Sequence, residues 1–399
     1  MRICMLTYSF YESDTRILQY AGALAQRGDK VDVIALRHEG KPAIEVLNGV
    51  RVFRIQSRSR SRENRLGYIF QVLCFMVRSA VFLTRRHLSL NYDVIHVHSV
   101  PDFLVFAAIV PKLLRAKIIL DIHDILPEFY ASKFNLPADS LTYRSLLIVE
   151  RVSVAFADHV IAANEIWRDR LLSRSVRSGG CTAIRNYPDP SIFFPRSGAA
   201  RKGKFLVIYP GTLNRHQGLD IAIRAFAQIV NLIPEAEFQI YGEGPEKNSI
   251  IALRDALGLK DRVRIEGLLS LNEIAPRMAS ADVAVVPKRI STGFGNEASS
   301  TKIMEFMALG VPVIVSRTRI DSYYHDDSMV QFVEPENEDD LANAILLLRN
   351  NPERRDQLVR QAFRYLLNNN WERKQFEYLS VVDALASPVT EKAERELHV

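Results

Sequence analysis

The feature that most constrains the fold is a repeated alternation of short apolar segments with segments of helical period. Val- and Ile-rich segments such as Arg2–Leu6 and Val31–Leu36 alternate with stretches whose apolar residues recur every three to four positions. Strands that are apolar throughout and separated by helices form parallel sheets covered on both faces. The pattern pauses in a stretch rich in Pro, Gly and small polar residues, Asn186–Gly203, and restarts at Phe205–Tyr209. We therefore predict an α/β chain with two Rossmann-like, doubly wound domains.

The length of the chain fits this organisation, because 399 residues correspond to two or three domains of ordinary size. We assign residues 1–195 to an N-terminal domain, 196–370 to a C-terminal domain and 371–399 to a final helical segment. Ligands of doubly wound sheets bind at the carboxyl ends of the strands. We expect the two domains to face each other across a ligand-binding cleft.

The cysteines and the N-terminus bear on the compartment. Cys4, Cys74 and Cys181 are odd in number, far apart and free of C-x-x-C pairing, which argues against a disulfide framework or a structural zinc site. The N-terminal residues lack the basic region and the cleavage site of a signal peptide. We expect a cytoplasmic protein.

Positive charge is concentrated in one window. Between Arg51 and Leu90 there are nine arginines and one acid, Glu63, so this window carries +8 whereas the whole chain carries +6. The basic character therefore belongs to a patch, and by itself it does not indicate nucleic-acid binding. Within it, Leu66–Leu83 has the length of a short membrane span, but Arg78 interrupts the apolar sequence.

We predict an amphipathic helix in this window and not a membrane span. Two alternatives stay open for it: an ordinary helix that packs on its domain with solvated arginines, and a helix that lies on an anionic membrane surface. The second alternative predicts a peripheral protein at the inner face of the cell membrane.

The densest functional signal is a Gly-rich loop that leads into a helix and then into a buried strand, Ser291–Ser316. Ser299, Ser300 and Thr301 are candidate caps of this helix, whose free N–H groups and positive dipole end suit a phosphate. Lys302 in the first turn is unfavourable for the helix dipole, and a bound anion would explain its presence. The alternative is a lysine that faces solvent.

Two acids flank the predicted phosphate site. We place Glu297 in the loop and Glu305 in the helix. Carboxylates accept hydrogen bonds from sugar hydroxyls. We therefore predict that Glu305 holds a ribose and that Glu297 holds a second sugar.

These motifs resemble those of the retaining glycosyltransferases of family 4, which have the GT-B fold and carry E-x7-E near a Gly-rich loop. In the C-terminal half the resemblance extends to three further segments: Tyr209-Pro-Gly-Thr-Leu-Asn-Arg-His-Gln-Gly, Tyr241-Gly-Glu-Gly-Pro and Ala281-Asp-Val-Ala-Val-Val-Pro. In the N-terminal half, Asp93-Val-Ile-His-Val-His and Leu120-Asp-Ile-His-Asp resemble bacterial polysaccharide members. Trp371-Glu372 resembles the start of the family's last helix, which returns to the first domain.

The resemblance implies transfer of a sugar from a nucleotide diphosphate-sugar to an acceptor with retention of anomeric configuration, in bacterial exopolysaccharide or O-antigen synthesis. A histidine at the position of His123 contacts the donor sugar in the family, so His123 and Glu297 are the predicted catalytic residues. The resemblance also implies that the first domain binds the acceptor and the second the nucleotide-sugar donor. The basic window favours a lipid-linked saccharide as acceptor. The predicted donor-binding residues are Gly211, Arg215, Gly293, Phe294, Gly295, Ser299, Ser300, Thr301, Lys302 and Glu305.

Some positions depart from the family pattern. Thr212 and Gln217 replace an arginine and a lysine of many relatives, so Arg215 and Lys302 are the candidate cations for the diphosphate. No D-x-D motif is present, and we therefore expect a metal-independent reaction in which these cations and helix amides neutralise the leaving group.

The segment after the first strand also departs from the family, because Phe10–Arg16 replaces the usual Gly-Gly. Asp14 and Arg16 either contact the acceptor or cap and flank the first helix. His98 is a weaker acceptor candidate, and His96, which points the same way, is predicted to pack at the end of the sheet.

Three other functions remain to be separated from transfer. A sugar-nucleotide 2-epimerase of the same fold would use the same donor site without an acceptor, and a non-catalytic protein would bind the sugar nucleotide only. A nicotinamide dehydrogenase is disfavoured because no G-x-G-x-x-G follows the first strand.

Overall fold

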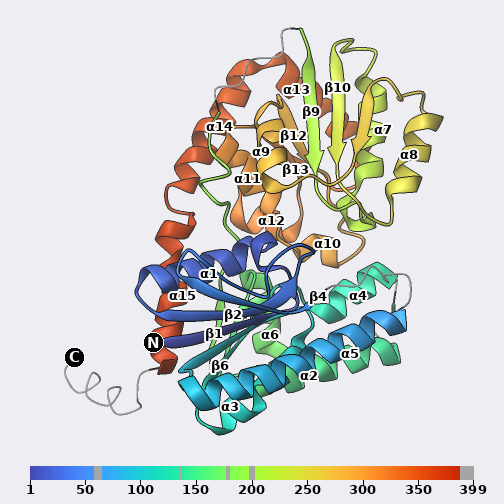
Figure 1. Cartoon of the computed structure of the whole chain (residues 1–399). Helices are drawn as coiled ribbons and strands as arrows, with labels where there is room; N and C mark the ends of the chain where they lie inside the picture. Colours follow the sequence, from blue (N-terminus) through green and yellow to red (C-terminus); the bar gives the residue numbers. More distant parts are fainter. Residues whose placement is uncertain (58–64, 135, 138, 177–179, 197–202, 387–399) are drawn as a thin grey trace. The chain divides into compact units, whose positions relative to one another are not determined.

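The computed structural model describes residues 1–57, 65–134, 136–137, 139–176, 180–196 and 203–386 (Figure 1). The chain divides into an N-terminal unit of Met1–Ala131, Asn135–Asn186 and Glu372–Val399, and a C-terminal unit of Ser132–Phe134 and Tyr187–Trp371. This division comes earlier than the predicted boundary at 195/196. The physical reason is that Phe193 is buried in the apolar core of the C-terminal unit, beside Ile208 of its sheet.

The N-terminal unit contains an eight-stranded sheet in the order β3-β4-β2-β1-β5-β6-β7-β8. Its strands are parallel except for β3, which is antiparallel to β4. The bounds are β1 Arg2–Thr7, β2 Lys30–Arg37, β3 Ile44–Leu47, β4 Val50–Ser57, β5 Val94–His98, β6 Lys117–Ile122, β7 His159–Ala162 and β8 Gly180–Ala183. The inner strands β1, β2, β5 and β6 are buried almost throughout, as the apolar segments predict.

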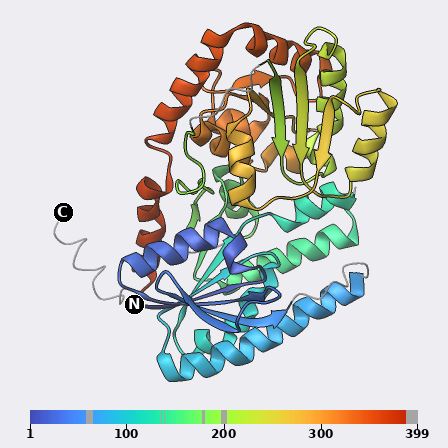
Figure 2. The same ribbon diagram turned by 45° about the horizontal axis from the view of Figure 1, so that its top comes forward.

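Helices cover both faces of this sheet. Their bounds are η1 Tyr11–Ser13, α1 Thr15–Gln26, α2 Arg65–Leu90, η2 Asp102–Ala108, α3 Ile109–Leu113, α4 Leu126–Phe134, α5 Leu141–Phe156, α6 Glu165–Arg174 and α15 Trp371–Ala386. Figure 2 shows α2 in blue on the side of the sheet opposite α1 in dark blue. Tyr378 of α15 stacks on Tyr20 of α1, with ring centroids 4.1 Å apart, so the last helix packs on the N-terminal unit.

The C-terminal unit contains a six-stranded parallel sheet in the order β11-β10-β9-β12-β13-β14. Its strands are β9 Phe205–Pro210, β10 Ala236–Tyr241, β11 Val263–Glu266, β12 Val283–Val286, β13 Val313–Ser316 and β14 Gln331–Val333. Its helices are η3 Arg215–Gln217, α7 Leu219–Ile229, α8 Lys247–Ala256, α9 Leu271–Ala279, α10 Phe294–Glu297, α11 Thr301–Leu309, α12 Arg319–Tyr324, α13 Glu338–Asn350 and α14 Pro352–Leu366.

Two apolar clusters lie on the two faces of this sheet. One is built with α7, α8 and α13, and the other with α9, α11 and α14. The carboxyl ends of β9 and β10 are in register, with Pro210 paired to Tyr241, and β12 is the other neighbour of β9. The loops after these three strands therefore meet at one edge of the sheet, and the site is built there.

Candidate active site

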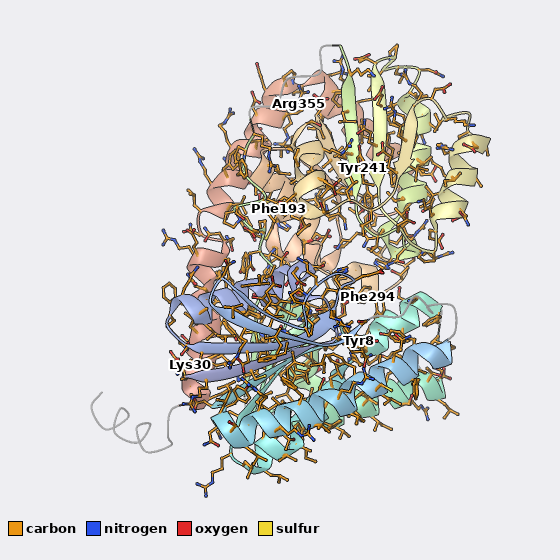
Figure 3. The ribbon with its side chains drawn as sticks, viewed as in Figure 1. Tyr8, Lys30, Phe193, Tyr241, Phe294 and Arg355 are labelled. Carbon is orange, nitrogen blue, oxygen red and sulfur yellow. The ribbon has the colours of Figure 1, made fainter. Side chains whose placement is uncertain are left out.

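The turns after β9 and β10 are bound to each other by backbone hydrogen bonds. The Gly211 amide donates to the Tyr241 carbonyl at 2.8 Å, and the Leu213 amide donates to the Glu243 carbonyl at 3.0 Å. A Cβ atom on Gly242 would lie 1.8 Å from the Gly211 carbonyl oxygen, so this approach requires glycine. Figure 3 labels Tyr241 at the end of β10, where these turns begin.

Lys302 reaches this edge from the first turn of α11. Gly211 has φ +139°, and a Cβ atom on it would lie 3.0 Å from the Lys302 Nζ. The same Nζ lies 5.3 Å from the centre of the Tyr209 ring. The Lys302 side chain is therefore directed to the turn after β9, which rules out the solvent-facing alternative. Gly211 and Lys302, both predicted to bind the donor, therefore lie next to each other.

The charge of Lys302 is poorly compensated. Its pKa is lowered to about 8, mainly by burial; Glu305 and Asp321 raise it in part, and Lys288 contributes to the lowering. Among the ion pairs of the described residues, none within 4.0 Å involves Lys302. A half-buried ammonium with this environment favours an anionic ligand.

The start of α11 differs from the prediction in its capping. Ser300 occupies the N-cap position but makes no side-chain cap hydrogen bond, and its Oγ is buried without a partner. The Thr301 side chain lowers the pKa of Glu305 one turn later. Among the described residues, Ser300 thus leaves the amides of the first turn available to an anion.

The two acids occupy different environments. Glu297 lies at the end of the short helix α10, not in a loop, and its Oε1 forms an ion pair with Arg319 Nη1 at 3.0 Å. Asn296 Oδ1 also accepts from the Arg319 amide at 2.7 Å. Glu305 is half-buried on α11, where burial raises its pKa and Lys302 and Thr301 lower it. The carboxylates thus lie on either side of the α11 start, as the E-x7-E spacing predicts.

The Gly-rich residues before Glu297 shape the backbone. Gly293 has φ +64°, and a Cβ atom on Gly295 would lie 2.2 Å from the Arg289 carbonyl oxygen. Phe294, labelled in Figure 3, is buried, and its ring meets that of His216 at 5.3 Å. Phe294 therefore packs the loop onto η3.

Lys288 is a buried cation at this edge of the sheet that the sequence patterns do not single out. It is 1% exposed, its Nζ lies 2.6 Å from Asp321 Oδ2, and it donates to the Ala298 carbonyl at 2.8 Å. This bond fixes the backbone between Glu297 and Ser299. The available signal was its position two residues after the buried strand β12, where a lysine is unusual.

Arg215 is exposed on η3, and its carbonyl accepts from Arg289 Nε at 3.1 Å. Gln217 accepts a hydrogen bond from the Tyr209 hydroxyl at 3.1 Å. Burial, Lys302 and Lys288 lower the pKa of His216 to about 4. At neutral pH this imidazole is therefore uncharged, and Arg215 and Lys302 are the cations of this edge that carry no carboxylate partner among the described residues.

The N-terminal unit carries a separate cluster around Asp121, at the end of β6. Both Asp121 oxygens accept from Arg16, at 2.7 and 2.8 Å, and Oδ2 lies 3.0 Å from both His98 Nδ1 and His123 Nε2. Burial alone would raise the pKa of Asp121, but Arg16 and His123 hold it well below its usual range. Burial lowers and Asp121 raises the pKa of His123, with a net rise that favours the imidazolium.

The predicted acceptor residues Asp14, Arg16 and His98 lie in or near this cluster in different environments. Asp14 accepts from the Ile17 amide and caps α1, while Arg16 is 4% exposed and bound to Asp121. Both residues therefore fit the alternative in which they cap and flank the first helix. His98 is fully buried, and His123 retains partial exposure.

His96, His98 and Asp121 offer atoms within 4.8 Å of one another, a spacing that suits a metal ion. Arg16 already binds both oxygens of Asp121, however, and His96 Nδ1 lies 3.0 Å from the Tyr378 hydroxyl. Asp121 is thus bound by Arg16, His98 and His123, whereas the Nε2 atoms of His96 and His98 are buried without a hydrogen-bond partner among the described residues.

Comparison with known proteins assigns both halves of the chain. Residues 13–186 match the glycosyl transferase 4-like domain, and residues 192–365 match the glycosyl transferases group 1 model.

Two curated relatives are similar over most of the chain. The phosphatidylinositol N-acetylglucosaminyltransferase gpi3 subunit of Schizosaccharomyces pombe is 23% identical over 335 residues, 83% of this chain and 68% of that protein. The D-inositol 3-phosphate glycosyltransferase of Thermobifida fusca is 24% identical over 377 residues, 89% and 84% of the two chains.

Solved structures share the fold. A sucrose-phosphate synthase from Thermosynechococcus elongatus superposes with a TM-score of 0.77 at 21% identity, over 96% of this chain and 99% of that one. Anabaena HepE in complex with UDP-glucose gives a TM-score of 0.71 at 16% identity, over 96% and 100%. With its two parallel α/β sheets, the chain belongs to the group 1 glycosyltransferases of family 4, a retaining family with the GT-B fold, which transfer sugars from nucleotide-sugar donors.

Proposed function

We propose that this glycosyltransferase moves a sugar from a nucleotide diphosphate-sugar to a lipid-linked saccharide, in the synthesis of a bacterial exopolysaccharide or O-antigen, as a peripheral protein on the cytoplasmic face of the membrane. The observation that carries the donor site is the Lys302 Nζ directed at Gly211, beside the uncapped start of α11. A diphosphate there would meet an ammonium, helix amides and the nearby Arg215.

Each predicted residue has a chemical task in this reaction. Glu305 holds the ribose hydroxyls and Glu297 the hydroxyls of the transferred sugar, with the ion pair to Arg319 fixing the direction of the Glu297 carboxylate. Lys302, Arg215 and the α11 amides stabilise the negative charge that develops on the departing diphosphate, which supports a reaction without a metal ion. His123, charged and oriented by Asp121, contributes from the N-terminal unit to binding the donor sugar.

The proposed reaction forms one bond and breaks one bond at the anomeric carbon. The acceptor oxygen forms a bond to the anomeric carbon, the bond from that carbon to the diphosphate oxygen breaks, and the acceptor proton passes to the departing phosphate. No side chain is assigned as a covalent nucleophile. Retention then requires the acceptor to approach from the side of the leaving group.

Support for the lipid-linked acceptor is indirect. It comes from the basic window of Arg51–Leu90 and from the similarity to the gpi3 subunit, which is named as a phosphatidylinositol N-acetylglucosaminyltransferase.

The test begins with a thermal-shift screen over sugar nucleotides, since a ligand of the native state raises the unfolding temperature. The best donor is then incubated with lipid-linked and water-soluble saccharides. Release of nucleotide diphosphate together with an elongated lipid-linked product supports the proposal. An epimerised sugar still attached to its nucleotide, or binding without turnover, would contradict it.

A further inference from the structure

Helix α2 is apolar on its outer side as well as its inner side. The inner side packs on the sheet and on η2 through buried residues that include Val72, Phe75 and Leu83. The outer side carries a stripe at helical spacing of Phe70, Leu73, Val77, Val81 and Leu88, between 43% and 68% exposed. The surface of a helix that faces only water is normally polar. This outer stripe therefore requires an explanation beyond the packing of the domain.

Two neighbouring helices extend the stripe into a surface. Both α2 and α5 pack on η2, and α3 packs on α2, so the three helices share one face of the N-terminal unit (Figure 1). On α5 the exposed apolar residues recur at helical spacing, and on α3 they lie at its start and end. They are Leu141, Ile148 and Val152 on α5, and Ile109, Leu113 and Leu114 on and after α3, up to 84% exposed. We call this surface the α2/α3/α5 face. Its size exceeds that of scattered apolar side chains.

The charge of this face has a single sign. Exposed arginines border the apolar stripes: Arg78 and Arg85 on α2, Arg115 after α3, and Arg144 and Arg151 on α5. The three helices contain one acid, Glu150, which is buried and bound to Arg174 at 2.5 Å. A surface that is both apolar and positive is complementary to anionic phospholipid headgroups above acyl chains.

The contacts of α2 also indicate whether it would cross a membrane or lie along its surface. Gly67–Leu90 is long and apolar enough to cross one, with a mean hydropathy of 1.6 and 22% of its most apolar window buried. Crossing would, however, separate its inner side from the sheet. It would also break the ion pair of Arg86 with Asp32 at 3.0 Å and the bond from the Tyr92 amide to His87 Nδ1 at 3.1 Å. A helix held in this way lies along the surface.

We propose that the α2/α3/α5 face docks the protein on an anionic phospholipid bilayer, with the apolar stripes in the interfacial region and the arginines on lipid phosphates. This extends the predicted membrane contact from one segment to a three-helix surface. The inference rests on the proposed function and deepens it, because a lipid-linked acceptor lies in a membrane. Docking can fail, however, while transfer to a water-soluble saccharide still occurs, so the two failures are distinguishable.

The experiment is co-sedimentation of the full chain with vesicles of phosphatidylcholine alone or with about one-third phosphatidylglycerol, at low and high salt. We expect binding to the anionic vesicles that weakens with salt, because screening reduces the attraction. The variant Arg78→Gln/Arg85→Gln should bind about 25-fold more weakly, at about fivefold for each arginine. Phe70→Gln/Val77→Gln/Leu88→Gln should lose binding at both salt concentrations.

The matched control is Leu232→Gln/Leu268→Gln, which changes apolar residues that are similarly exposed in the C-terminal unit. It should bind like the unaltered protein. Circular dichroism and the donor-induced thermal shift show that each variant is folded.

Three results would overturn the proposal. They are an unaltered protein that stays in the supernatant with anionic vesicles at low salt, a control that loses as much binding as the stripe variant, and retention in the membrane after alkaline carbonate extraction, which would indicate a span. A protein that does not bind vesicles but forms dimers, and becomes monomeric in the stripe variant, would assign the face to a second copy instead.

Discussion

Donor binding is expected to weaken about tenfold between pH 7 and pH 9, because Lys302 loses its proton over this range. Its pKa of about 8 makes the free side chain about nine-tenths charged at pH 7 and about one-tenth charged at pH 9. If the diphosphate binds the ammonium form, affinity follows that fraction. Linkage fixes the direction of the pH dependence. A bound anion raises the pKa of Lys302, so donor binding takes up protons above pH 8.

Two substitutions separate this effect from other titrations. Lys302→Met removes a charge-assisted contact of about 1.5 to 3 kcal/mol, so Kd at pH 7 should rise about 10- to 150-fold and become flat with pH. Lys302→Arg keeps its charge over the whole range and should also give a flat profile, at an affinity closer to that of the unaltered protein. His216 does not contribute, since its pKa of about 4 lies outside the range.

Isothermal titration calorimetry with the best nucleotide-sugar, in buffers of different ionisation enthalpy, measures both the affinity and the protons taken up. The reasoning is refuted if the unaltered protein binds equally well at pH 7 and pH 9, or if Lys302→Met retains the pH dependence. Either result would mean that the ammonium does not contact the diphosphate.

Three further predictions concern the candidate site residues and two buried ion pairs. Glu305→Ala should weaken donor binding in the thermal-shift assay, whereas Glu297→Ala and His123→Ala should lower kcat more than they change KM; normal transfer by all three variants would remove these assignments. Asp121→Asn leaves the charge of a buried arginine uncompensated and should cost about 3 to 5 kcal/mol of unfolding free energy, measured by urea denaturation. Lys288→Met should cost a similar amount and slow transfer, and combining it with Asp321→Asn should recover part of the stability; no recovery would mean that the two groups are not coupled.

The sequence predicts the two parallel sheets well because each inner strand is a continuous apolar run bounded by turn residues. The strand β3 was not predicted, since its exposed Ile44 and Val46 resemble an irregular surface segment. A local signal was present: Asn48 and Gly49 both have positive φ, as a two-residue hairpin turn requires. Isolated strands at a sheet edge depend on such turn chemistry more than on hydrophobicity.

The sequence singles out candidate site residues where they lie within one motif, and not where distant segments meet. Glu297, Lys302 and Glu305 are singled out because they lie close together in one Gly-rich segment and the helix that follows it. The bond of Lys288 to the carbonyl of Ala298, and the contact of Arg16 with Asp121 across 105 positions, depend on how strands far apart in the chain are paired. Periodicity gives no information on such contacts, which arise only when the sheet is assembled.

The two lysines at the edge of the C-terminal sheet show why pairing, more than burial, distinguishes a structural cation from a ligand-binding one. Lys288 has Asp321 as an internal partner, so its charge is compensated whether or not a ligand is present. Lys302 has no ion pair within 4.0 Å among the described residues, and burial shifts its pKa toward the neutral form. A negative group supplied from outside would therefore stabilise its charge further. The amides at the start of α11, which Ser300 does not cap, also favour a negative group at this position. Both features therefore favour a diphosphate there.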